Sequence, residues 1–159
     1  MTTLYVQEGQ ALRPADAAEI LHQAQTLLAI RLRPGSAVLD HPEVVRTFLR
    51  LHFAPLEHEV FAVIFLDGAG RLIELVELFR GTLTRTVTPA REIAKEALTR
   101  NAAAVILIHN HPDGDSAPSF EDQRTTQELK RALALVEVEV LDHLIIGESI
   151  FSFCEAGVL

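Results

Sequence analysis

The sequence ILIHNHPDGDSAPSFED occupies residues 106–122 and joins an apolar, strand-like run to the start of a polar helix-like segment. His109 and His111 lie two positions apart near the beginning of this stretch. Strand side chains repeat every second residue, so in an extended chain both imidazoles leave the backbone on the same face. We therefore expect two ring nitrogens to converge at the end of a strand.

A carboxylate follows the two histidines at the predicted start of the helix. Ser119 and Asp122 are three residues apart, which is the spacing of a capping box. The intervening loop contains residues that bar regular structure, namely Pro112, Gly114 and Pro118. Asp122 should then lie in the first turn of the helix, facing back toward the strand end.

Two histidines and one aspartate form the ligand set of a catalytic zinc site, which leaves a position open, whereas structural zinc sites are closed by four ligands. Ser119 and Asp122 could instead be capping residues only, and the Asn-His-Pro segment only a turn. Their joint occurrence directly after a buried-type apolar run favours metal ligation by His109, His111 and Asp122.

The composition is that of one compact domain with a small appendage. The chain has 159 residues, 48% of them hydrophobic, and a formal net charge of -8. An acidic chain makes few phosphate contacts, so direct DNA binding by this chain alone is not expected. The single cysteine, Cys154, excludes an internal disulfide, fits a reducing cytoplasm and is expected to be buried. No apolar run reaches the ~18 residues of a membrane span, so we expect a soluble, cytoplasmic protein.

Apolar periodicity predicts an alternation of helices and strands. A short N-terminal helical segment, residues 1–40, precedes a metal-binding domain, residues 41–159. Helices are expected at residues 14–30, 42–53, 91–100 and 119–136, and strands at 59–67, 72–78, 81–88, 103–108, 139–141, 144–146 and 150–153. The pattern predicts an α/β fold of three layers, with a mixed β-sheet flanked by helices.

Hydrolysis at such a site needs a group that takes a proton from water and passes it on. Glu59 stands at the mouth of the most apolar predicted strand, where a charged residue either caps the strand or works in a cleft. Glu57 stays open as an alternative base. Asp113 and Asp115 are expected to bind backbone amides in a turn, and Glu121 to face solvent. Ser119 has two possible functions, as helix cap or as donor to a developing oxyanion.

One further histidine falls outside this set of residues. Asp142 and His143 lie between the two short predicted strands at residues 139–146. We expect a structural role for this pair, such as a hydrogen bond that orients a ligand histidine.

The downstream residues resemble the JAMM metalloprotease signature, in which His-x-His-Pro is followed by a Ser, with seven residues between the second His and that Ser, and by an Asp three positions after the Ser. The wider resemblance is to the RadC family and covers residues 42–159. It is carried by LEHEVF (56–61), FLD (65–67), GT (81–82), REI (91–93), HNHP (109–112), PSFED (118–122) and DHLIIG (142–147). The resemblance is to the short form, because residues 1–40 are too few and too acidic for the helix-hairpin-helix region of longer RadC proteins.

The resemblance implies the JAMM, or cytidine-deaminase-like, fold, with Zn²⁺ held by His109, His111 and Asp122. It implies Glu59 as general acid/base and Ser119 as oxyanion helper in hydrolysis of a peptide or isopeptide bond, in a family associated with DNA repair. The substrate would be a protein or peptide. The alternative is a non-catalytic binding module in DNA repair, with a structural or vestigial metal. The oligomeric state stays open.

Overall fold

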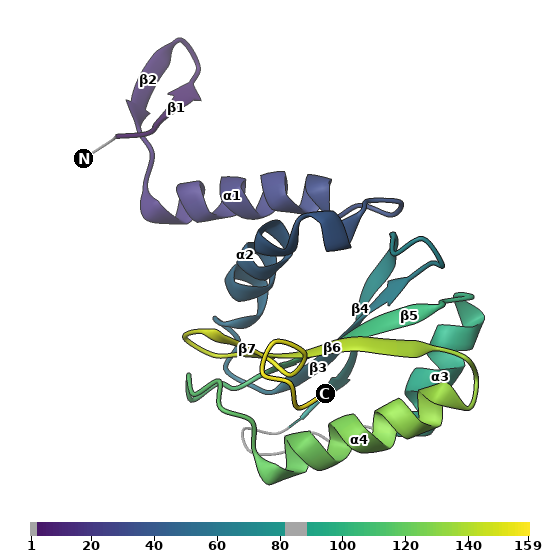
Figure 1. The fold of residues 1–159 in the computed structure, drawn as a ribbon. Coiled ribbons are helices and arrows are strands. Elements are labelled where there is room, and N and C mark those ends of the chain that lie inside the picture. Colours follow the sequence, from purple (N-terminus) through teal and green to yellow (C-terminus); the bar gives the residue numbers. More distant parts are fainter. Residues whose placement is uncertain (1–2, 82–88) are drawn as a thin grey trace.

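The computed structural model of the protein describes residues 3–81 and 89–159, and its centre is a five-stranded sheet (Figure 1). The strand order is β4-β3-β5-β6-β7. The strands are β3 (Val60–Leu66), β4 (Leu72–Arg80), β5 (Ala104–Asn110), β6 (Glu139–Ile146) and β7 (Ile150–Ser152). Only β5 and β6 pair in parallel, and the other neighbours are antiparallel, so the sheet is mixed as predicted.

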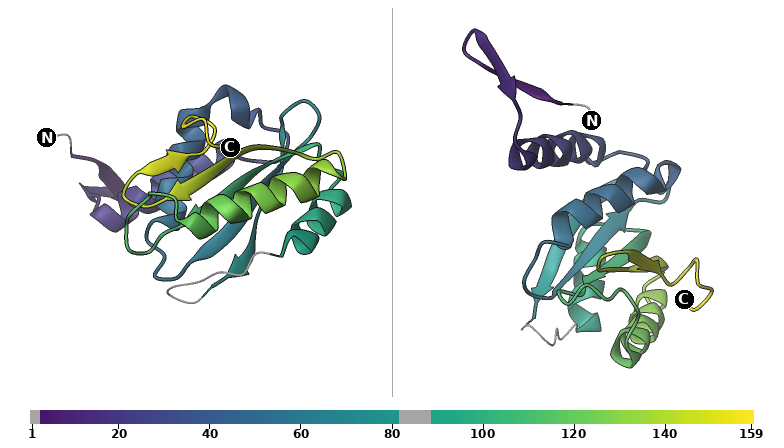
Figure 2. Two further views of the ribbon diagram at one scale, coloured as in Figure 1. Left: turned by 60° about the horizontal axis from the view of Figure 1, so that its bottom comes forward. Right: turned by 90° about the vertical axis from the view of Figure 1, so that its left-hand side faces the viewer.

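Helices cover both faces of this sheet, which completes the predicted three layers (Figures 1 and 2). On one face α2 (Pro42–Phe53) buries Val45, Leu49 and Phe53 against alternate residues of β3 and β5. On the other face α3 (Ala90–Thr99) and α4 (Phe120–Ala134) pack on the remaining alternate residues. Every residue of β3 and β5 is buried, because helices cover both sides of these two strands.

One strand prediction differs from the structure, and another falls on residues that the structure does not describe. The segments expected at residues 139–141 and 144–146 are one continuous strand, β6, because Asp142 and His143 pair with β5 rather than forming a turn. The strand expected at residues 81–88 lies almost wholly outside the described residues.

The N-terminal segment was only partly predicted. A hairpin of β1 (Tyr5–Glu8) and β2 (Ala11–Pro14) precedes the helix, and α1 (Ala17–Arg31) begins after the N-cap Asp16. The hairpin was missed because its residues show no clear alternation of buried and exposed positions; all but one are exposed. Figures 1 and 2 show this hairpin standing away from the sheet.

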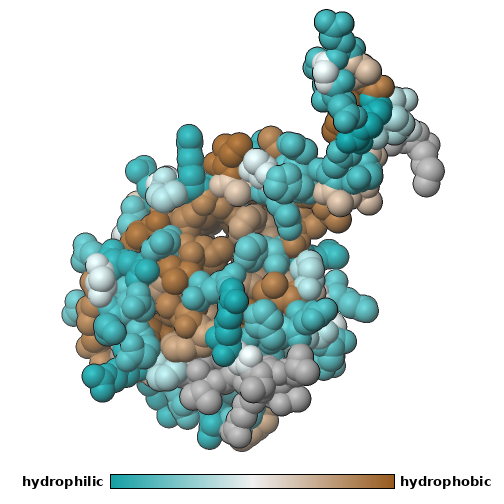
Figure 3. All heavy atoms as spheres, turned by 180° about the vertical axis from the view of Figure 1, so that it is seen from behind, coloured by the Kyte–Doolittle hydropathy of each residue, from teal (hydrophilic) through white to brown (hydrophobic). Residues whose placement is uncertain are grey.

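Between the N-terminal helices and the sheet lies an apolar hollow, seen from behind in Figure 3. Its volume is about 380 Å³. It lies on the α2 side of the sheet and is lined by Ala29, Leu32, Pro34, Val38, Phe48, Ile64, Leu72, Glu74 and Leu75. A short 3-10 helix, η1 (Val38–Asp40), links this region to α2.

Cys154 was expected to be buried, and this prediction is wrong because the residue is exposed. It lies in the turns that follow β7, where its backbone N–H donates to Asp142 Oδ1 at 2.9 Å. This bond fixes the main chain and leaves the thiol outside the core. None of the helices in the described ranges combines the length and apolar composition needed to cross a membrane.

Candidate metal centre

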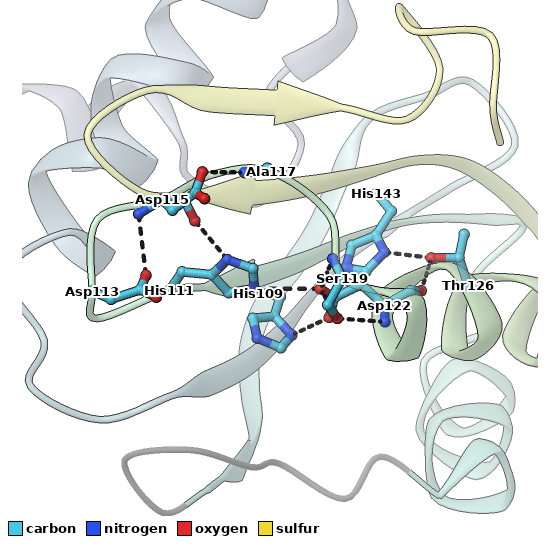
Figure 4. Close-up of polar contacts among 9 residues, drawn as sticks. All are labelled: His109, His111, Asp113, Asp115, Ala117, Ser119, Asp122, Thr126 and His143. Carbon is cyan, nitrogen blue, oxygen red and sulfur yellow. Dashed lines mark hydrogen bonds and ion pairs between the residues drawn. The ribbon is translucent and has the colours of Figure 1, made fainter.

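Three side chains from two elements meet at the end of β5 (Figure 4). His109 comes from the strand, His111 from the first residue after it, and Asp122 from the first turn of α4. Each offers one ligand atom, and these atoms lie within 4.8 Å of one another. His111 Nε2 is 3.4 Å from Asp122 Oδ2, and His109 Nδ1 is 3.6 Å from Asp122 Oδ1. Ligand atoms about 2.0–2.1 Å from a tetrahedral zinc lie roughly 3.3 Å apart, and the two histidines lie close to this distance from different oxygens of the same carboxylate.

The capping box at the start of α4 fixes the carboxylate. Ser119 is the N-cap, and its Oγ accepts a hydrogen bond from the backbone N–H of Asp122 at 3.1 Å. In return, Asp122 Oδ2 accepts from the backbone N–H of Ser119 at 2.8 Å and from its hydroxyl at 2.6 Å. Capping and metal ligation are thus not alternatives, because the same bonds that begin the helix orient Asp122 toward the histidines.

The loop between the histidines and Ser119 is held by its own aspartates, as predicted. Asp113 Oδ1 accepts from the N–H of Asp115 at 3.1 Å, and Asp115 Oδ1 accepts from the N–H of Ala117 at 2.9 Å. Glu121 is exposed and pairs with Arg124 at 2.7 Å, which confirms its predicted solvent position.

The hydrogen bonds of His111 leave one of its nitrogens directed at the site. Its Nδ1 lies 2.6 Å from the carbonyl oxygen of Asp115, which can only accept, so Nδ1 carries the hydrogen. The neutral ring then presents the lone pair of Nε2 to a carboxylate oxygen 3.4 Å away. Two such atoms attract each other only when a proton or a cation lies between them. The contact with Asp122 accordingly raises the pKa of His111, against an opposing effect of burial.

His109 and Asp122 have the protonation states that suit binding of a divalent ion. Burial lowers the pKa of His109 to about 4, so the ring is neutral near pH 7, and its Nε2 is buried without a hydrogen-bond partner in the described part of the chain. Burial also opposes ionisation of Asp122, but the contact with His111 and the hydrogen bonds from Ser119 outweigh it and hold the pKa of that carboxyl below its usual range. A buried neutral imidazole, a second imidazole and a carboxylate fit a divalent metal ion such as zinc.

The general-base candidates differ in exposure. Glu59 is half-buried directly before β3, whereas Glu57 is exposed. The β3–β5 ladder ends at the pair Phe61↔His109, so Glu59 lies two residues along the chain from the strand partner of His109. Glu59 is not one of the three clustered residues.

His143 has the structural role expected for it, although in the described part of the chain its ring bonds Thr126 and not a ligand histidine. It is fully buried, and its Nδ1 lies 2.7 Å from Thr126 Oγ1, whose hydroxyl is 2.6 Å from the carbonyl oxygen of Asp122. If the hydroxyl donates to this carbonyl, Nδ1 must donate to the hydroxyl, and the chain of bonds ends on the backbone of the aspartate. The role of Thr126 was not predicted, because it depends on a contact with His143, which lies 17 residues later in the chain.

Sequence comparison shows which known proteins this chain resembles. A family model described as RadC-like JAB domain matches residues 39–158. A UPF0758 protein of Leptothrix cholodnii is 50% identical over 156 residues, which cover 94% of this chain and 69% of that protein. A UPF0758 protein of Acidovorax is 48% identical over 158 residues, covering 97% and 66%. A UPF0758 protein of Vibrio cholerae is 49% identical over 138 residues, covering 87% of each. These names state no reaction or substrate.

Proposed function

Because the chain belongs to the RadC family, with its RadC-like JAB domain, we propose that it is a zinc-dependent hydrolase that cleaves a peptide or isopeptide bond. The observation that carries this proposal is the buried group of His109, His111 and Asp122. A zinc ion held by these three side chains would act as a Lewis acid toward a carbonyl group and would lower the pKa of water.

The remaining chemistry falls to the chain's own groups. Glu59, directly before β3, would accept the proton of the attacking water and transfer it to the leaving nitrogen. The hydroxyl of Ser119 donates to Asp122 Oδ2 in this structure, and rotation about its Cβ–Oγ bond would redirect the hydrogen toward an oxyanion. The substrate we propose is a protein or peptide.

Metal analysis combined with a peptidase screen tests this function. We expect the purified parent to contain about one zinc and to cleave members of a panel of unfolded proteins and isopeptide-linked peptides. Glu59→Gln should keep the zinc and retain only a small residual rate of cleavage, whereas His109→Ala should lose both zinc and cleavage. Glu57→Gln is the matched control, because Glu57 is exposed and two residues away, and it should keep both.

Two results would contradict the proposal. If His109→Ala retained as much zinc as the parent, the metal site would lie elsewhere. If the zinc-loaded parent cleaved nothing, and Glu59→Gln captured the same proteins as the parent, the chain would instead be a binding module.

A further inference from the structure

The side chain of Asn110, between the two histidines, reaches across to the strand that carries Glu59. Asn110 is only 1% exposed. Its Oδ1 accepts from the backbone N–H of Val60 at 2.6 Å, and its Nδ2 donates to the backbone carbonyl of His58 at 3.1 Å. Only this orientation of the amide satisfies both backbone groups, because an N–H needs an acceptor and a carbonyl needs a donor. One side chain thus binds the main chain immediately before and immediately after Glu59.

These bonds stand where the backbone ladder ends. The pairing of β3 with β5 runs from Leu66↔Ala104 to Phe61↔His109. Beyond this point the chain before β3 would separate from β5, since the ends of strands fray when they lack partners. The amide of Asn110 takes the place of the missing backbone partner.

A third bond completes the restraint on the same residue. The carbonyl of Glu59 accepts from the backbone N–H of Gly81 at 2.9 Å. Gly81 follows β4, on the other side of β3 from Asn110. The backbone around Glu59 is therefore held from both neighbouring strands, and Asn110 supplies the restraint from β5, the strand that also carries His109.

We infer that Asn110 is a positioning residue, which fixes the backbone around Glu59 and so sets where that carboxylate stands relative to the two histidines. The inference rests on the proposed role of Glu59 in hydrolysis. The side chain of Asn110 itself leaves β5 on the opposite face from that of His109, because neighbouring residues of a strand alternate. Its effect on the site therefore passes through the main chain of residues 58–60.

Amide hydrogen exchange, followed by NMR, tests the restraint without any assay of activity. In Asn110→Ala the amide of Val60 should exchange about tenfold faster or more, because it has lost its acceptor. The amide of Gly81 should also exchange faster, although Asn110 does not touch it, because its acceptor belongs to Glu59. Ile106→Val, in the same strand, is the matched control for a small loss of stability and should leave both amides at the parent rate.

Kinetics test the consequence for the reaction. Displacing a catalytic group by about 1 Å can cost on the order of 100-fold in rate, so Asn110→Ala should lower kcat by that order while zinc content and KM stay near the parent values. In a Glu59→Gln background the same substitution should have no further effect, because Asn110 acts through Glu59.

Asn110→Asp provides a second variant if the alanine variant does not fold. Its carboxylate can accept from Val60 but cannot donate to His58, so kcat should fall about tenfold. The inference is overturned if the Gly81 amide of the Asn110→Ala protein exchanges at the parent rate. It is equally overturned if the Asn110→Asp protein shows both the parent exchange rate at Gly81 and the parent kcat. It is also overturned if Asn110→Ala slows the Glu59→Gln protein as much as the parent. If the parent has no peptidase activity, the proposed function fails, and the exchange rates alone decide the inference.

Discussion

Ser119 Oγ lies 2.6 Å from Asp122 Oδ2, so the N-cap of α4 directly contacts a candidate metal ligand. The same hydroxyl accepts from the backbone N–H of Asp122 at 3.1 Å. Helix capping and the proposed catalytic role therefore fall on one oxygen, and their effects on stability and activity can be separated by the choice of substitution.

Substitutions of Ser119 should affect folding and cleavage differently. Ser119→Ala should lower the free energy of unfolding by about 1 kcal/mol through loss of the cap, whereas Ser119→Gly should cost only a few tenths. Both remove the hydroxyl and should lower kcat by roughly 100-fold or more if it stabilises an oxyanion. Urea denaturation and steady-state kinetics provide the two measurements.

Ser119→Thr is the control, because it keeps both the cap and the hydroxyl and should stay close to the parent in stability and in kcat. A Ser119→Gly protein with the parent kcat would show that the residue is only a cap.

A second prediction concerns the buried hydroxyl of Thr126. Thr126→Val keeps the shape but leaves Nδ1 of His143 and the carbonyl of Asp122 without this partner, so we expect a loss of about 1–3 kcal/mol in the free energy of unfolding. Thr126→Ser should cost less than this. Chemical denaturation of both variants measures the difference.

The double variant Thr126→Val/His143→Phe should lose less stability than the sum of its single variants, because removing both partners leaves fewer unpaired polar groups. Strict additivity would mean that the 2.7 Å contact between the two side chains contributes no coupling.

The residues of the metal centre could be predicted from sequence because they are local. Strand alternation places His109 beside His111, and the capping-box spacing places Asp122 in the first helical turn. Both rules act within 14 residues, and the aspartates of the loop between them bind that loop's own backbone.

The contacts that support the centre could not be predicted in this way. Asn110 meets His58 and Val60 across 52 and 50 residues, and Thr126 meets His143 across 17. Such contacts depend on the strand register, which no local pattern encodes. The continuous strand β6 was divided for a related reason, because Asp142 and His143 are polar residues whose partners, Ser152 and Thr126, come from other elements.

The two buried histidines predict an acid-sensitive fold for protein freed of metal with a chelator. Burial lowers the pKa of His109 to about 4 and that of His143 to about 3, below the ordinary value of 6.5. The unfolded chain therefore binds protons first as the pH falls below about 6.5, and stability is lost in that direction. Each histidine should contribute a loss of about 2 kcal/mol between pH 6.5 and 5, from 1.36 kcal/mol per pH unit.

Urea denaturation across this pH range measures the effect. The raised pKa of His111 has the opposite effect, because its contribution to stability is present at low pH and is lost as the pH rises above about 6.5. It therefore does not mask the loss expected between pH 6.5 and 5. His143→Phe should show about half the pH dependence of the parent. Parallel curves for the two proteins would show that His143 is not buried as a neutral ring.

The last prediction concerns Gly147, in the turn between β6 and β7. A Cβ at this position would lie 2.3 Å from the carbonyl oxygen of Gly114, which accepts from the N–H of Glu148 at 2.8 Å. The clash is with backbone, so Gly147→Ala must displace the loop that carries Asp115, the partner of His111. We expect a loss of about 1–3 kcal/mol in the free energy of unfolding and a zinc affinity weakened roughly tenfold or more.

Gly68→Ala is the matched control, since nothing lies within 4 Å of its added Cβ, and it should retain zinc and be as stable as the parent or slightly more so. Calorimetric zinc titration would contradict this account if both variants bound the ion as tightly as the parent.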